Sequence, residues 1–125
     1  GPAKAIGLVL PELSGKLDGS SMRVPTPNVS LVDFKFHAKR ATTVDEVNEA
    51  IKAAAKSNRL EGIVTWTKEP LVSSDLNHDP HSATFAVDQT KVIGGTFVRI
   101  VAWYDNEWGF SCRMADTAAG LGKLG

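Results

Sequence analysis

The sequence predicts an α+β fold, in which a mostly antiparallel sheet has its helices packed beside it. Alternating apolar and polar residues at positions 29–39 predict a half-buried antiparallel strand. Apolar residues at helical spacing over positions 44–57 predict an amphipathic helix. Three short β-type segments separated by turn residues between positions 83 and 104 predict an antiparallel meander. Because strands and helices occupy separate stretches, the helices should lie to the side of the sheet.

The composition is that of an ordinary globular protein, and residues 1–125 are predicted to form a single domain. Hydrophobic residues make up 42% of the chain and charged residues 22%. Fourteen basic and fourteen acidic residues cancel, so no basic excess indicates nucleic-acid binding. No apolar run is long enough to span a bilayer, and the only cysteine, Cys112, cannot form an intrachain disulfide. We therefore expect a cytoplasmic protein without a membrane or nucleic-acid partner.

The first third of the chain is predicted to form one short helix, followed by the strand at 29–39. The helix should run from Ala3 to about Leu10. It should end at Pro11, because proline inside a helix costs about 3 kcal/mol. Gly15 and Gly19 then mark a turn. In the strand, four apolar residues share one face: Val32, Phe34, Phe36 and Ala38.

The helix at 44–57 has signals at both ends. Thr43 and Glu46 have the spacing of a capping box, in which each side chain bonds the other residue's backbone N–H. Asp45 near the start and Lys52 near the end complement the helix dipole. A helix is therefore predicted here on three independent grounds.

The second half of the chain is predicted to complete the sheet and to end in a helix. Strands are predicted at 63–67, 83–87, 91–93 and 96–104, with a loop at 71–80. The last strand is apolar on both faces except for Arg99, so it should be central. A final helix is predicted over about 107–119, with Asp105 as its cap. Gly120 and Gly122 should fray its end.

Arg23 is a candidate anion contact. Pro25 and Pro27 follow it and stiffen the backbone, so its guanidinium is presented from a fixed position. A planar fork of donors suits a phosphate or a carboxylate, and a charged hydrogen bond contributes about 1.5–3 kcal/mol. The alternative is an arginine with a surface or structural role, and the residues alone favour this alternative.

Asn106 is a candidate amide contact. It follows the last predicted strand, and its side chain offers one acceptor and two donors. Such a group can pair with another amide, such as a carboxamide on a ligand. The alternative is a turn residue whose side chain bonds its own backbone, as asparagine often does. The residues alone do not separate these two interpretations.

The other reactive side chains give weaker signals. Cys112 would need a base or a helix N-terminus to become an efficient nucleophile, and a small apolar residue on a helix is the favoured interpretation. His78 and His81 are two possible metal ligands without a third, so a polar loop that hydrogen-bonds itself is favoured over a metal site. His37 lies on the polar face of its strand and should be solvated. No metal site is predicted.

Several motifs together resemble the catalytic domain of glyceraldehyde-3-phosphate dehydrogenase. They are Met22-Arg23-Val24-Pro25-Thr26-Pro27-Asn28-Val29-Ser30-Leu31-Val32-Asp33, Trp103-Tyr104-Asp105-Asn106-Glu107, Leu10-Pro11-Glu12-Leu13 and Arg113-Met114-Ala115-Asp116. The resemblance covers nearly the whole chain in order, but only the C-terminal part of that family's polypeptide. It implies one piece of a tetrameric, NAD-dependent, phosphorylating enzyme of glycolysis.

The resemblance also implies roles for two residues. In this family a cysteine thiolate adds to the aldehyde, a histidine takes the proton, and hydride passes to NAD. Inorganic phosphate then attacks the thioester that remains. Arg23 corresponds to the arginine that helps to hold the phosphate groups of the sugar phosphate and of the attacking phosphate. Asn106 corresponds to the asparagine that bonds the nicotinamide carboxamide.

The chain departs from the family pattern where the chemistry is carried out. The family's Ser-Cys-Thr-Thr-Asn-Cys motif, its general-base histidine and its Gly-rich nucleotide-binding half have no match. No catalytic residue is therefore assigned, and the chain alone is expected to be inactive. Phe110 stands where many members have tyrosine, and Pro2 where alanine is usual. Gly1 falls at a phosphate-contacting position of the family, although Gly1-Pro2 is also typical of an expression scar.

Two alternatives remain. Erythrose-4-phosphate dehydrogenase is similar around residues 77–82 and 108–110, although Pro27 followed by Asn28-Val29-Ser30 favours the glyceraldehyde enzyme. The other alternative is a non-enzymatic oligomerisation module. Since members of the family are tetramers whose subunits touch through this region's sheet, the chain could associate through exposed apolar surface.

Overall fold

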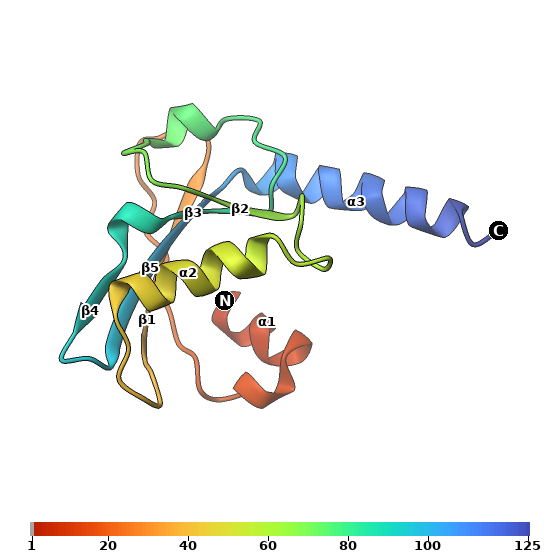
Figure 1. Cartoon of the computed structure of the whole chain (residues 1–125). Coiled ribbons are helices and arrows are strands. Elements are labelled where there is room, and N and C mark those ends of the chain that lie inside the picture. Colours follow the sequence, from red (N-terminus) through yellow and green to blue (C-terminus); the bar gives the residue numbers. More distant parts are fainter. Residues whose placement is uncertain (1) are drawn as a thin grey trace.

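The computed structural model describes residues 2–125, with side chains from residue 5 onward, and Gly1 lies outside it. The described chain forms one sheet with helices beside it (Figure 1). The α-helices are α1 (Pro2–Val9), α2 (Val44–Ala55) and α3 (Asn106–Gly122). The strands are β1 (Ser30–His37), β2 (Val64–Thr67), β3 (Ala83–Ala86), β4 (Lys91–Ile93) and β5 (Phe97–Tyr104). Three 3-10 helices, η1 (Pro11–Leu13), η2 (Ser73–Leu76) and η3 (Val87–Gln89), lie between them.

The sheet has the strand order β1-β5-β3-β2, and β4 also pairs with β5. The pairs β1–β5, β3–β5 and β4–β5 are antiparallel. Only β2 and β3 run parallel to each other within the described chain. The predicted α+β fold with a mostly antiparallel sheet is thus confirmed, and β5 is central, as its apolar pattern predicted.

The predicted meander is wrong in one respect, because β3 and β4 do not form a hairpin. Both strands lie along the same side of β5, where β3 pairs near Ala102 and β4 pairs near Val98. The segment between them, expected to be a hairpin turn, is the 3-10 helix η3. The chain therefore continues along β5 in two short strands, and the predicted hairpin forms only between β4 and β5.

A contact with α2 explains the position of η3. The Asn48 side-chain amide donates to the carbonyl of Val87 over 3.0 Å, and the Thr90 hydroxyl donates to Asn48 Oδ1 over 2.6 Å. Thr90 is only 3% exposed. Because η3 is bonded to a helix distant in the sequence, local turn signals could not predict its course.

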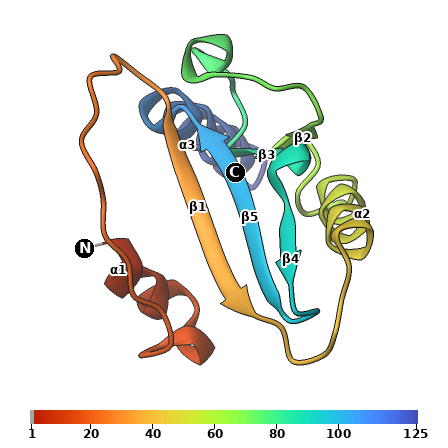
Figure 2. The same cartoon turned by 90° about the vertical axis from the view of Figure 1, so that its left-hand side faces the viewer.

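β1 lies at the edge of the sheet, next to β5 (Figure 2). Its antiparallel pairing was predicted, but its burial was overestimated. On the face predicted to be buried, Val32 is 45% exposed and Phe34 is 36% exposed. The described helices leave this part of the face uncovered, and Figure 2 shows α1 beyond the outer edge of β1 rather than over the strand.

The three α-helices begin close to the predicted residues, and α1 also ends close to the predicted residue. α1 ends at Val9, just before Pro11. α2 has the complete capping box between Thr43 and Glu46. α3 is capped by Asp105, as predicted, but it continues to Gly122 instead of fraying at Gly120. From Met114 onward every residue of α3 is exposed, and Figure 1 shows this half of the helix projecting away from the sheet.

The described core is small and lies around β5. Its most deeply buried apolar side chains are Val98 and Val101 of β5, together with Leu76 of η2 and Ala86 of β3. Within residues 2–125, no helix combines the length and the apolar character that a membrane span requires.

Candidate functional site

The pairing of β1 with β5 brings the two candidate site segments to one end of the sheet. Ser30 at the start of β1 lies opposite Tyr104 at the end of β5. The chain that carries Arg23 enters β1 at this end, and the chain that carries Asn106 leaves β5 there (Figure 2). Residues far apart in the sequence are thus gathered by the antiparallel register.

Asp105 is the buried centre of this end of the sheet. It is 2% exposed. Its Oδ2 accepts hydrogen bonds from the Asn28 side-chain amide and the His78 backbone N–H, both over 2.9 Å. Its Oδ1 accepts from the backbone N–H of Trp108 over 3.2 Å, which caps α3. Asn28 also donates to Asn77 Oδ1 over 2.7 Å, so three segments meet at one carboxylate.

The hydrogen bonds keep this buried carboxylate charged. Burial alone would raise the pKa of Asp105, but donation from His78, Trp108 and Asn28 outweighs it and lowers the pKa below the ordinary value of 3.8. Asp105 therefore acts as an acceptor for all of these donors at neutral pH.

Two residues beside this centre have left-handed backbone conformations. His78 has φ 65° and stacks its ring on Trp108, with centroids 4.1 Å apart and planes inclined by 20°. Val29, directly after Asn28, has φ 67° and is 9% exposed. A β-branched residue rarely adopts such a φ, so tertiary contacts must hold this segment against its local preference.

Arg23 and Asn106 are both presented to solvent. Arg23 makes no hydrogen bond or ion pair with the described part of the chain, and it is exposed. Asn106 is the first residue of α3 and is also exposed. Its side chain makes no hydrogen bond to described residues, so the self-bonded turn is not what the structure contains. Both groups are available to a solute.

The histidine-containing loop bonds itself, as predicted. Asp79 Oδ1 accepts from the His81 backbone N–H over 3.0 Å and lies 2.6 Å from His81 Nδ1. Asp79 Oδ2 accepts from the Thr84 hydroxyl over 2.8 Å. Burial raises the pKa of Asp79, but these bonds outweigh it and lower the pKa below 3.8. Among the described residues, no cluster of three or more potential ligands could hold a metal ion.

The two remaining candidates are His37 and Cys112. His37 is exposed at the far end of β1, as predicted, and its ring lies 5.0 Å from that of Phe97. Cys112 is a free, partly buried thiol within α3. Neither residue joins the Asp105 network.

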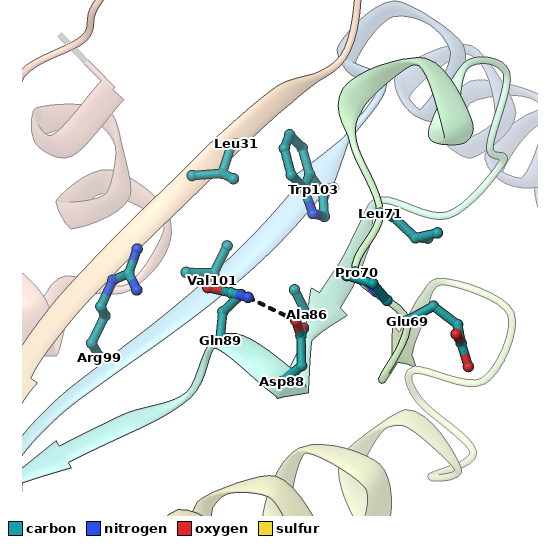
Figure 3. Close-up of a pocket in the computed structure, with 10 residues that line it drawn as sticks. All are labelled: Leu31, Glu69, Pro70, Leu71, Ala86, Asp88, Gln89, Arg99, Val101 and Trp103. Atoms are coloured by element: carbon teal, nitrogen blue, oxygen red, sulfur yellow. Dashed lines mark hydrogen bonds between the residues drawn. The ribbon is translucent and has the colours of Figure 1, made fainter.

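A separate hollow of about 180 Å³ lies on one face of the sheet (Figure 3). Ten residues line it: Leu31, Glu69, Pro70, Leu71, Ala86, Asp88, Gln89, Arg99, Val101 and Trp103. Arg99 is already paired, because its Nε lies 2.8 Å from Asp33 Oδ1. The Arg99 guanidinium first, and then Lys35, lower the pKa of Asp33. Neither Arg23 nor Asn106 lines this hollow.

Sequence reasoning missed Asn28 and Asn77 as members of the site and treated Asp105 only as a helix cap. The signal that could have found Asn28 is the antiparallel pairing of the strands at 29–39 and 96–104. That pairing places the residues before the first strand beside those after the second. Asn77 had no such signal, because its place depends on the course of the loop.

Gly109 allows α3 to approach the histidine-containing loop. It is buried, and a Cβ at this position would lie 3.0 Å from the His81 carbonyl oxygen. We expect Gly109→Ala to destabilise the chain by about 1 kcal/mol, because this contact outweighs the better helix propensity of alanine. Gly120 in the same helix has open space around it, so Gly120→Ala should stabilise by up to about 1 kcal/mol. Urea unfolding followed by tryptophan fluorescence compares the two variants. If both substitutions changed the free energy of unfolding in the same direction, the close approach of α3 to the histidine-containing loop would be contradicted.

The fold and the site define an α+β domain in which two chain segments, one with an exposed arginine and one with an exposed amide, meet at one end of a mixed sheet. Residues 1–106 match the family model described as glyceraldehyde 3-phosphate dehydrogenase, C-terminal domain. The chain belongs to this family.

Similar curated proteins agree with this assignment. The glyceraldehyde-3-phosphate dehydrogenase of Xanthobacter flavus is 66% identical over 125 residues, which are 100% of this chain and 37% of that protein. The enzyme of the same name from Cereibacter sphaeroides is 66% identical over 124 residues, or 99% of this chain and 37% of that protein. That from Geobacillus stearothermophilus is 52% identical over 125 residues, again 100% of this chain and 37% of the relative. The chain thus spans little more than a third of the length of these relatives.

Proposed function

We propose that this chain is part of an NAD-dependent, phosphorylating glyceraldehyde-3-phosphate dehydrogenase. In this proposal the chain holds phosphate and cofactor groups, while the catalytic cysteine and histidine lie outside it, so the chain alone is inactive. The main observation in support is the joining of the Arg23 and Asn106 segments at one end of the sheet by the Asn28–Asp105 hydrogen bond. Family membership supplies the reaction.

Arg23 binds phosphate oxygens in this proposal. Its guanidinium is exposed and unpaired among the described residues, and Pro25 and Pro27 restrict the backbone that follows it. A guanidinium donates two parallel hydrogen bonds to a phosphate, which orients the phosphate as well as attracting it. Arg23 therefore places the phosphate groups of the sugar phosphate and of the attacking phosphate.

Asn106 binds the carboxamide of the nicotinamide ring. Its amide is exposed and makes no hydrogen bond to described residues, so its donors and acceptor fit a second amide. NAD, when bound, accepts the hydride from the substrate. Asn106 orients the ring for that transfer, and the exposed Phe110, one turn further along α3, adds an apolar surface without a hydroxyl.

The exposed apolar residues of β1 favour assembly with further protein surface. Val32 is 45% exposed and Phe34 is 36% exposed, and they are neighbours on one face of the strand. Monomeric proteins rarely leave such residues uncovered in contiguous patches. A homo-oligomer, with four subunits as in the family, would cover them, and light scattering that finds only monomers of the complete protein would contradict this part of the proposal.

The test uses the complete polypeptide that carries this sequence. We expect Arg23→Ala to raise the KM for inorganic phosphate roughly 10- to 100-fold, which corresponds to the loss of one charged hydrogen-bonding group. Asn106→Ala should raise the KM for NAD about 5- to 10-fold, the effect of a neutral hydrogen bond. Arg40→Ala is the matched control, because Arg40 is exposed and follows β1 at the end of the sheet opposite to the site.

Unchanged KM values in both site variants would reject the proposed roles. Turnover by residues 1–125 alone would reject the inactivity of the isolated chain. The same assay with erythrose 4-phosphate compares the alternative substrate. The relatives described above are named for glyceraldehyde 3-phosphate, so we expect that aldehyde to give the higher kcat/KM.

A further inference from the structure

We propose that Asp105 and Asn28 are positioning residues that set the anion contact and the carboxamide contact together. This inference rests on the proposed roles of Arg23 and Asn106. Neither positioning residue has to touch a ligand, since each acts through its neighbour in the chain. Among the described residues, their hydrogen bond is the one side-chain hydrogen bond that joins the two ligand-binding segments.

Covalent connection carries the effect from this hydrogen bond to both contacts. Asp105 is bonded directly to Asn106, so a shift of the buried carboxylate moves the backbone that carries the amide. Asn28 follows Arg23 along a short segment that contains Pro25 and Pro27. Each proline has a fixed φ, so this segment transmits a displacement better than a flexible one. A change at the Asn28–Asp105 contact should therefore displace both Arg23 and Asn106.

The conformation of Val29 indicates that the segment is held in place from outside. Its φ of 67° is unfavourable for a β-branched residue. Directly before it, Asn28 is fastened to Asp105 and Asn77, and directly after it β1 begins at Ser30. Without the Asn28 contacts, we expect the segment to relax to an extended backbone and to move Arg23 as it does so.

A carboxylate is the group that this position requires. Its two oxygens accept three N–H groups, from Asn28, His78 and Trp108, and water cannot replace it because the side chain is 2% exposed. An asparagine has the same shape, but it turns one acceptor into a donor. In Asp105→Asn, that donor must face one of the three N–H groups, so at least one contact is lost while the size of the side chain is kept.

The test measures both KM values in the complete polypeptide. We expect Asp105→Asn to raise the KM for NAD and the KM for inorganic phosphate together, each by about 10- to 100-fold, because a misplacement of about 1 Å can cost up to about 100-fold. Asn28→Ala should raise both KM values in the same way. Because Asn28 is only partly buried, this substitution should disturb folding less than Asp105→Asn does.

Thr90→Val is the matched control for stability. Thr90 is 3% exposed and donates a buried hydrogen bond to Asn48, but it lies between η3 and β4, outside the Asp105 network. This variant should lower the melting temperature while leaving both KM values within about twofold.

The possible outcomes separate this inference from the proposed function. If Asp105→Asn and Asn28→Ala lower the melting temperature but leave both KM values unchanged, the pair is only structural and the inference is overturned. It is also overturned if only one of the two KM values rises, because the contacts are then not set together. If Arg23→Ala and Asn106→Ala themselves leave the KM values unchanged, the proposed function fails first.

Discussion

Replacing Leu76 by alanine is expected to lower the free energy of unfolding by about 2–5 kcal/mol, the range for large-to-small substitutions in a core. Leu76 is 5% exposed and belongs to η2, which packs against β5. Its removal leaves a cavity as well as losing apolar burial. Chemical denaturation followed by tryptophan fluorescence measures the change. Leu121→Ala is the control, since Leu121 is 64% exposed and should change stability by less than about 0.5 kcal/mol.

The effect of Leu76→Ala should reach the candidate site. Asn77 and His78 follow Leu76 directly, and they bond Asn28 and Asp105 respectively. Loosening η2 therefore releases one of the three segments that meet at Asp105. A variant with unchanged stability would show that η2 is not anchored by this side chain.

Replacing Val98 by alanine should cost about 2–3 kcal/mol. Val98 is 0% exposed and lies in β5 between Phe36 of β1 and Val92 of β4. The substitution removes two methyl groups, and the strands on both sides restrict collapse into the space that remains.

Ile93→Ala is the matched control for Val98→Ala. Ile93 belongs to the neighbouring strand β4 but is 66% exposed, so its truncation should change stability by less than about 0.5 kcal/mol. The midpoints of denaturant unfolding compare the stabilities of the two variants when the free energy of unfolding falls with denaturant at the same slope in both. Equal losses would contradict the central place of β5 in the core.

Local signals predicted those features that depend on neighbouring residues. The capping box at Thr43 and Glu46 formed, because both groups lie within one turn of the helix they start. Asp105 capped α3 for the same reason. α1 ends just before Pro11, because the backbone nitrogen of proline carries no hydrogen and cannot donate the next hydrogen bond of the helix.

Features that depend on distant contacts were predicted less well. The continuation from β3 to β4 depends on Asn48 of α2, and nothing near residues 87–90 specifies that partner. The burial of β1 was overestimated because alternation shows only that one face is apolar, whereas cover depends on other elements. Gly120 did not end α3, since glycine lowers helix propensity by only about 1 kcal/mol and the helix there meets no obstacle.

The candidate site also has features that neighbouring residues determine and features that depend on distant contacts. Residue chemistry and resemblance predicted Arg23 as an anion contact and Asn106 as an amide contact, because donor type and motif are properties of the chain. The meeting of their segments at Asp105, with Asn28 and His78 as partners, depends on the register of β1 with β5 and on the loop after η2. A buried carboxylate needs donors from several directions, and only folding brings residues so distant in sequence within hydrogen-bonding distance.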